Sequence, residues 1–340
     1  MPMKGFTSPL WPIRYKPLPD ELLTSWLVRL AYGHGLKVQT FCNLAFGNRH
    51  QVWNRDVDRL APEWLLDELS RRTGTPLEVA YGTTLRSYEG RVFPKFKSSG
   101  ALFWLQTLKM YHRKREGYGV QFCGACLADD PLPYFRKAWR VSFNTICIKH
   151  NRMLHDRCPQ CGSAVVFHRM EMGRGSAFEI GSMATCHACG CDLRESPLSP
   201  IMSYDEGATA WHVRLCRSIV DGFDLRDTDV NVGVMRVMHQ LSTLLTTRFQ
   251  NRGLCQYICH QLGVEDIELL PGRMPIETRP LLERHHMMQL VAWLMDDLEP
   301  RLRGAWRAKA VRYNRMIKDF DDVPQFYAEI VEGFSDWRRQ

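Results

Sequence analysis

Four short pairs of metal-ligand residues, each with two residues between its members, constrain this chain more than any other feature. They are Cys123 with Cys126, Cys147 with His150, Cys158 with Cys161, and Cys186 with Cys189. Two ligands at this spacing lie on one tight turn, and two such turns can enclose a tetrahedral zinc ion. The sequence therefore predicts two Zn²⁺ sites, one built from three thiolates and an imidazole and the other from four thiolates.

The spacing alone leaves the assignment of ligands open. Combined in chain order, the first pair joins the second and the third joins the fourth, but the pairs can also interleave between the two metals. Cys191 follows closely enough to replace Cys189, and His155 and His187 are further candidate ligands.

The composition of both sites favours a structural role over catalysis. A catalytic zinc keeps one coordination position for water and needs a nearby acid or base. Each predicted site has four protein ligands, and His150 is flanked by Lys149 and Asn151 instead of a glutamate. The chain also lacks a G-x-x-x-x-G-K-[ST] phosphate-binding loop. We expect no enzymatic activity; the alternative is a zinc hydrolase or deaminase.

The number of cysteines bears on the cellular compartment. Twelve cysteines in a chain whose N-terminus lacks the apolar core of a secretory signal favour metal binding in a reducing compartment over disulfides. No stretch approaches the roughly 18 apolar residues that span a bilayer. The sequence predicts a soluble, cytoplasmic protein that does not contact a membrane.

Helical periodicity on both sides of the cysteine-rich stretch predicts a mainly α protein. We expect a helical N-terminal domain with a helix-turn-helix over residues 1–120. A zinc-ribbon or zinc-finger module with both sites is expected over 121–195, and a helical C-terminal domain over 196–340.

Two N-terminal helical segments carry boundary signals. Asp20 is the expected N-cap of the first helix, and Pro62 the expected first position of a later one that ends at Gly74. Residues Thr75 to Glu78 then form a capping box for the next helix. So short a turn resembles a helix-turn-helix, and an ordinary helical hairpin is the alternative. The second helix carries few side chains that could read bases.

The charge is positive, with a net +8 and a pI near 8.9. Residues 134–152 and 301–318 are rich in Lys and Arg and contain no acidic residue. These stretches predict contact with nucleic acid or a protein partner. The candidate binding residues are Arg136, Lys137, Trp139, Arg140, Arg301, Arg303, Arg307, Lys309, Arg312 and Arg315. The alternative is that Trp139 packs internally and the basic residues only solvate the surface.

The order of these features resembles the TniQ/TnsD family of transposition proteins. The stretch "PLPDELLTSWLVRLAYGHG" is similar to the opening motif of that family, here Pro19, Glu21, Ser25, Trp26, Arg29, Leu30 and Ala31. The helix pair at 62–84 and the motif "FCGACL…ICIKHNRML…CPQCG" follow in the expected order. The resemblance covers roughly residues 10–195.

This resemblance implies a non-catalytic adaptor. Such proteins select the insertion target and pass that choice to an AAA+ transposition regulator (TnsC/TniB-like), which activates the transposase. TnsD-type members bind a specific DNA site, whereas shorter TniQ members dock on an RNA-guided Cascade complex, in some systems as a homodimer. The length of this chain favours the second role, as in a CRISPR-associated transposon; sequence-specific DNA binding is the alternative.

Overall fold

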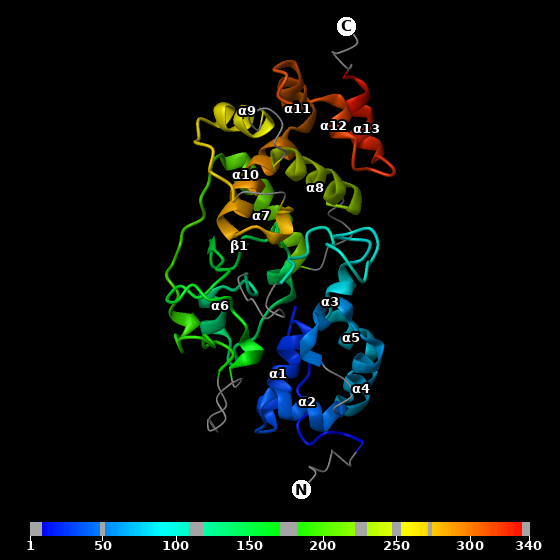
Figure 1. Ribbon diagram of the computed structural model, residues 1–340, viewed down its shortest axis with the longest axis vertical. Coiled ribbons are helices and arrows are strands. Elements are labelled where there is room, and N and C mark those ends of the chain that lie inside the picture. The colour runs from blue at the N-terminus through cyan, green and yellow to red at the C-terminus, as the bar shows by residue number, and fades with distance from the viewer. Residues whose placement is uncertain are drawn as a thin grey trace. The chain divides into compact units, whose positions relative to one another are not determined.

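The computed structural model describes residues 9–47, 52–108, 118–170, 182–221, 230–246, 253–270 and 274–334. The chain divides into two compact units, each assembled from three stretches (Figure 1). The first unit comprises Met1–Glu89, Gln106–Val141 and Arg152–Ser199, and the second comprises Gly90–Leu105, Ser142–Asn151 and Pro200–Gln340. These units cut across the expected boundaries at 120 and 195, so that three-part division stays a prediction.

The expected mainly α class is confirmed. The α-helices of the first unit are α1 (Leu23–Gly33), α2 (Val38–Phe46), α3 (Val57–Leu60), α4 (Glu63–Thr73), α5 (Leu77–Gly82) and α6 (Gly124–Asp129). Those of the second are α7 (Glu206–Val220), α8 (Val232–Thr246), α9 (Gly253–Leu262), α10 (Leu281–Asp296), α11 (Leu298–Arg307), α12 (Tyr313–Met316) and α13 (Gln325–Glu332). Strand β1 (Ile146–Cys147) belongs to the second unit and β2 (Arg152–Met153) to the first.

The helix α1 is buried from Leu23 through Ala31, and its start differs from the prediction. Its N-cap is Leu22, without a side-chain cap, so the expected cap at Asp20 is wrong. Asp20 adopts a φ of 54°, and its Oδ2 accepts a hydrogen bond of 2.9 Å from the backbone N–H of Ala138. This carboxylate therefore serves a distant loop of the same unit and not its own helix.

The N-terminal motif forms a buried polar network inside the first unit. Arg29 donates to the Glu21 carboxylate from Nε and from Nη2, both at 2.7 Å, and neither side chain is more than 6% exposed. The Ser25 hydroxyl donates to Glu21 at 2.9 Å and accepts from the Phe135 N–H at 3.0 Å. Trp26 donates through its indole N–H to the Tyr15 carbonyl at 2.7 Å. Burial and mutual pairing make these residues structural.

The helices α4 and α5 pack against each other as a short hairpin. Gly74 ends α4 with a φ of 63°, as predicted. The expected capping box is wrong, because α5 begins after Pro76 and has no side-chain cap. The Thr75 hydroxyl instead accepts a hydrogen bond of 2.7 Å from the Thr73 hydroxyl. The helix-turn-helix assignment stays a prediction.

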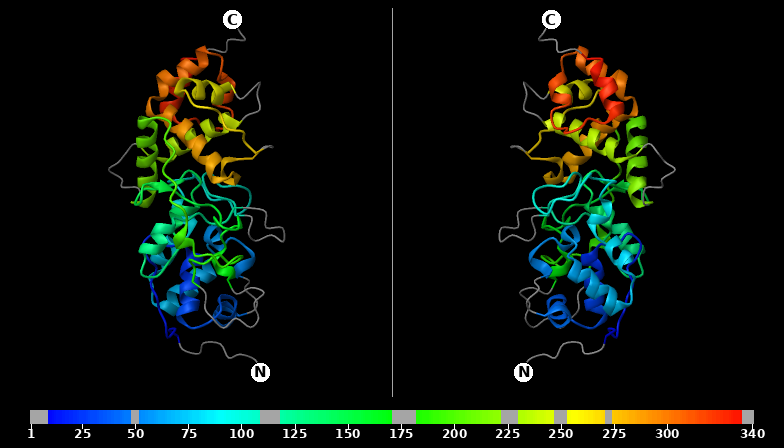
Figure 2. Two further views of the ribbon diagram at one scale, coloured as in Figure 1. Left: turned by 90° about the vertical axis from the view of Figure 1, so that its left-hand side faces the viewer. Right: turned by 90° about the vertical axis from the view of Figure 1, so that its right-hand side faces the viewer.

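In the second unit the central helix is α10, which packs against α7, α8, α9 and α11. Its buried residues run from Leu281 to Leu294 and include polar side chains. His285 is one of these, with Nδ1 at 2.8 Å from the Thr145 hydroxyl and Nε2 at 2.7 Å from the Met202 carbonyl. Figure 2 shows these helices, coloured from green to orange, gathered together in both views. No helix in the described part of the chain is long and apolar enough to cross a membrane.

The basic C-terminal stretch is two helices and not one. Lys309 has a φ of 58°, and α11 ends just before it. The Ala310 N–H donates to the Ala305 carbonyl and the Lys309 N–H to the Trp306 carbonyl, both at 2.9 Å. This pattern is a Schellman motif with lysine in the position that usually holds glycine. The basic stretch over 301–318 therefore does not form one continuous helix.

Candidate metal centres

The best-defined cluster of metal-ligand side chains in the first unit consists of Cys158, Cys161, Cys186 and Cys189. Their sulfur atoms all lie within 4.8 Å of one another. The sulfurs of Cys158 and Cys189 are 3.7 Å apart, as are those of Cys161 and Cys186. Ligands on a tetrahedral zinc with bonds of about 2.3 Å would have sulfurs roughly 3.8 Å apart. The four residues therefore fit a zinc ion.

Matching backbone turns bring these sulfurs together. The Gly162 N–H donates to the Cys158 carbonyl at 3.0 Å, and the Gly190 N–H donates to the Cys186 carbonyl at 2.9 Å. Both glycines have a positive φ, 68° and 79°, a conformation that side chains disfavour. The glycine after each C-x2-C pair thus lets the chain turn, and the turn directs both thiols of the pair toward the centre of the cluster.

The geometry decides among the ligands left open by the sequence. Among the described residues, the cluster joins the third pair to the fourth and includes neither Cys191, His155 nor His187. Cys191 contributes a carbonyl that accepts from the Cys186 N–H at 2.8 Å, while its own sulfur faces the Asp192 carbonyl at 3.6 Å. His155 is stacked on Phe122.

The thiols of this cluster have unequal electrostatic environments. Hydrogen bonding from the Ser163 side chain lowers the pKa of Cys161 to about 6, whereas burial raises the pKa of Cys186 to about 12. Four thiols in such proximity cannot all ionise without a counter-charge. A divalent cation provides that charge, which is why the donor set suits a metal ion.

The Cys123–Cys126 pair begins α6 in the first unit. Cys123 is the N-cap residue, and Cys126 lies in the first turn of the helix. Gly124 between them approaches the Leu193 carbonyl so closely that an added Cβ would lie 2.7 Å from the oxygen. This contact explains the glycine: a larger residue would push the pair away from the loop that follows the Cys₄ cluster.

The Cys147–His150 pair lies on a turn after β1 in the second unit. The Cys147 sulfur and His150 Nδ1 are 3.5 Å apart. Asn151 ends the turn with a φ of 50°, in the position that glycine occupies in the two Cys₄ turns. Asparagine is among the few residues that tolerate this conformation, so the sequence "HN" here replaces "CG".

The basic stretch at 136–140 is less exposed than expected. Trp139 is 3% and Arg140 0% exposed, so neither lies on a surface that a partner could contact. Arg140 pairs with Asp56 at 2.5 Å and with Asp58 at 3.2 Å. Burial raises the pKa of Asp58 to about 6, against the opposing effect of Arg140. For Trp139 and Arg140 the expectation of an exposed binding surface is wrong. Both side chains are buried, and the carboxylates of Asp56 and Asp58 bind the Arg140 guanidinium inside the unit.

The two neighbouring cations are only partly buried. Arg136 pairs with Asp130 at 2.8 Å, and its guanidinium lies 4.8 Å from the centre of the Trp139 ring. Lys137 donates to the Gly82 carbonyl at 2.6 Å and to the Ser87 hydroxyl at 3.0 Å. Both side chains therefore stabilise the first unit through contacts within it. Their role in binding a partner stays a prediction.

The second basic stretch divides in the same way between paired and exposed residues. Arg301 pairs with Asp296 at 3.3 Å and Arg303 with Glu299 at 2.7 Å. Arg307, Lys309 and Arg315 are exposed, and Arg312 is half-buried. Contact of the exposed members with another molecule stays a prediction.

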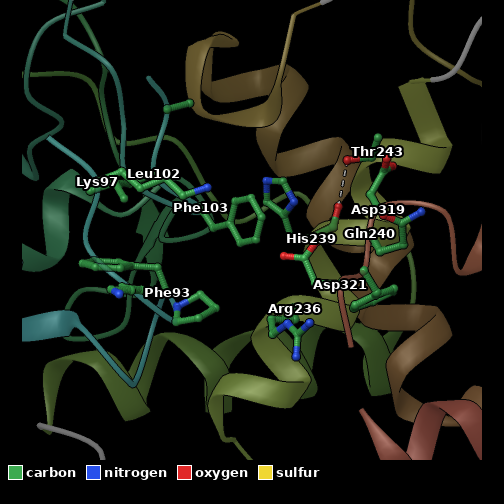
Figure 3. A pocket seen from close by; sticks show the side chains of 14 residues that line it. Phe93, Lys97, Leu102, Phe103, Arg236, His239, Gln240, Thr243, Asp319 and Asp321 are labelled. Atoms are coloured by element: carbon green, nitrogen blue, oxygen red, sulfur yellow. Dashed lines mark hydrogen bonds between the residues drawn. The ribbon is translucent and has the colours of Figure 1, made fainter. Parts of the chain in front are cut away.

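A cavity of about 740 Å³ in the second unit was not anticipated from the sequence (Figure 3). On one side the ring of Phe103 stacks on His239 of α8, with centroids 4.1 Å apart. His239 Nε2 lies 2.9 Å from the Glu277 carboxylate. Cations and carboxylates both line the space: Lys95, Lys97, Arg236, Asp319 and Asp321. This mixed lining favours no single charge on a ligand.

One comparison with known proteins assigns the chain to a family. Residues 12–154 match the family model described as TniQ, whereas no curated protein sequence matches the chain. The matched stretch contains the α1 network and the α4–α5 hairpin and ends before the Cys₄ cluster. A TniQ domain implies a transposition-associated role in target selection or as an adaptor. The match confirms the resemblance seen in the sequence: residues 12–154 of this chain are similar to the TniQ family.

Proposed function

We propose that this protein is a non-catalytic transposition adaptor that binds an RNA-guided Cascade complex and recruits an AAA+ regulator and, through it, the transposase. The TniQ domain over residues 12–154 is the observation that carries the proposal. The protein would join two partners through binding surfaces and would leave strand transfer to the transposase.

Two zinc ions are part of this proposal. One would be held by the Cys₄ cluster, and the sequence predicts ligands for the other in the pairs Cys123–Cys126 and Cys147–His150. Bound zinc would supply folding free energy on the order of 10 kcal/mol per site. With four protein ligands each, neither ion would keep a position for a reacting water. The sites therefore support a scaffolding role.

The exposed cations of the C-terminal stretch are the proposed contact for an acidic partner or RNA. The α5 helix is a weaker candidate for reading DNA, because its exposed side chains include Leu77 and Val79, at 46% and 44% exposure. Its six residues, Leu77–Gly82, contain no lysine or arginine to contact phosphate. This composition argues against the alternative of a sequence-specific DNA reader.

Binding of the full-length protein to three separate partners tests the proposal. The AAA+ regulator, a guide-RNA-loaded Cascade complex and target duplex DNA would each be immobilised and titrated with the protein. We expect binding to the regulator and to Cascade, with only weak, strongly salt-dependent binding to DNA. Failure to bind the regulator would overturn the adaptor role, and sequence-selective DNA binding at physiological salt would favour the alternative.

A pair of matched variants locates the contact. Arg307→Ala with Arg315→Ala removes two exposed charges from the C-terminal stretch, and Arg214→Ala with Arg217→Ala removes two exposed charges from α7 of the same unit. We expect the first variant to weaken binding to at least one partner about tenfold, or about 1.4 kcal/mol, and the second to leave it unchanged. Equal losses in both variants would point to nonspecific charge attraction.

A further inference from the structure

A second group of buried metal-ligand side chains lies within the second unit, outside the motifs predicted from the sequence. The ligand atoms of Cys255, Cys259, Asp266 and His286 all lie within 4.8 Å of one another. Cys255 is 0% exposed, Cys259 3% and His286 1%, and only Asp266 reaches solvent. The sequence predicts the two cysteines as small core residues and His286 as structural; their convergence is a feature of the tertiary fold.

Local structure explains how three separate segments supply these four side chains. Cys255 and Cys259 are four positions apart in α9 and so share its buried face. Gly263, with a φ of 64°, ends the helix, and the Val264 N–H donates back to the Cys259 carbonyl at 3.0 Å. This reversal returns the chain along α9, so that the Asp266 carboxylate lies 3.3 Å from the Cys255 sulfur.

The histidine is oriented as a metal-binding imidazole would be. Its Nδ1 lies 2.9 Å from the hydroxyl of Tyr204, which fixes the rotation of the ring. Its Nε2 is buried, has no hydrogen-bond partner among the described residues, and lies 3.4 Å from Asp266 Oδ1. A ring nitrogen left unsatisfied in the interior costs free energy unless something binds it. A metal-binding histidine typically binds the ion through one ring nitrogen, while its other ring nitrogen makes a hydrogen bond that orients the ring.

We propose that Cys255, Cys259, Asp266 and His286 bind a third zinc ion, which holds α9 and the loop after it against α10. Two thiolates, one imidazole and one carboxylate are a donor set that zinc accepts in tetrahedral geometry. The proposal is independent of the adaptor function. It also accounts for three buried ligand side chains that face a partly exposed carboxylate, an arrangement that would be costly without a cation.

The histidine beside His286 is not available to this cluster. His285, the neighbour of His286, has both nitrogens occupied by the Thr145 hydroxyl and the Met202 carbonyl. Of the two adjacent histidines, only His286 therefore offers a free nitrogen to the cluster.

Zinc stoichiometry of the purified full-length protein tests the proposal. Native mass spectrometry and elemental analysis should give three zinc ions per chain for the wild type and two for Cys255→Ala with Cys259→Ala. Cys216→Ala is the matched control, since Cys216 is a fully buried cysteine of the same unit outside the cluster. It should retain three ions.

A conservative variant guards against a folding defect in the double mutant. Asp266→Asn keeps the shape of the one partly exposed ligand and removes its charge. We expect it to fold normally and to release one of three zinc ions to a chelator at least tenfold faster than the wild type. Two ions in the wild type, or unchanged stoichiometry in the double variant together with unchanged release in Asp266→Asn, would overturn the proposal. Partner binding plays no part in these readouts, so the adaptor function stands or fails separately.

Discussion

The Cys₄ cluster at 158–189 and the cluster formed by Cys255, Cys259, Asp266 and His286 offer similar ligands on different supports. The first lies on two turns outside any α-helix, and two of its cysteines, Cys161 and Cys189, are exposed. The second lies largely on α9 and α10, and its two cysteines are buried. A metal ion must therefore do more for the first cluster than for the second.

Packing explains this difference. The described turns of the Cys₄ cluster lie outside any α-helix, and their backbone hydrogen bonds are local ones, such as Gly162 to Cys158 and Gly190 to Cys186. In contrast, α9 buries Leu254 and Ile258 beside its cysteines and packs against α8, α10 and α11. A helix with an apolar face retains most of its stability from packing. Metal should be essential to the fold at one cluster and supplementary at the other.

The largest expected effect is the loss of the Cys₄ site. Cys158→Ser with Cys186→Ser should abolish metal binding there and remove stabilisation on the order of 10 kcal/mol from the surrounding turns. Limited proteolysis should then cleave the described turns, 158–163 and 182–193, faster than in the wild type. Cys42→Ala, at a buried cysteine of the same unit outside both clusters, is the control and should keep the wild-type pattern.

A smaller effect is expected at the helical cluster. Cys255→Ala with Cys259→Ala should lower the free energy of unfolding of the second unit by about 1–3 kcal/mol, because two buried sulfurs and a metal are lost while the packing remains. Amide hydrogen exchange should still show α9 protected. Complete loss of that protection would mean that both clusters depend on metal alike, and the contrast drawn above would be wrong.

Two glycines with similar backbone conformations refine the comparison further. Gly190 in the Cys₄ turn has a φ of 79° and Gly263 at the end of α9 has a φ of 64°. An added Cβ would meet nothing within 4 Å at either site, so the cost of alanine is conformational, about 1–2 kcal/mol. Both variants should lower Tm, yet only Gly190→Ala should speed zinc release from the Cys₄ cluster. Equal rates of zinc release from the Cys₄ cluster in Gly190→Ala and Gly263→Ala would contradict the role of the Gly190 turn in orienting these ligands.

The smallest expected effect concerns the turn that ends at Asn151. Asn151→Gly should raise the thermal stability by a few tenths of a kcal/mol at most, because glycine adopts the observed φ of 50° with less strain. Asn151→Val should lower it by more than 1 kcal/mol, because a β-branched residue disfavours that conformation. Thermal denaturation of the two variants beside the wild type measures the difference. An increase in stability in Asn151→Val would contradict the positive φ at this position.

The sequence predicts the features of this protein that depend on neighbours in the chain. The pairs around Cys158 and Cys186 are visible because each turn is complete within six residues. The bounds of α2 and α9 are likewise visible in the sequence, because apolar spacing and a terminal glycine mark them. Tertiary pairings are different, since nothing local indicates that Asp56 and Asp58 bind Arg140.

The helical cluster and the break after α11 were missed for related reasons. Cys255 and His286 come from different helices, and only packing of α9 on α10 brings them together. The break at Lys309 uses a residue that seldom adopts a positive φ, so the sequence carries no glycine to mark it. Both features depend on contacts that a single stretch of sequence does not contain.

The Glu21–Arg29 pair has a practical consequence for mapping how the protein meets its partners. An alanine scan guided by the opening motif would replace residues whose polar groups pair with one another in the interior. Breaking a buried ion pair costs about 3–5 kcal/mol. Inactive mutants from such a scan would mostly be misfolded ones. Contact surfaces are better sought among residues that the motif leaves out.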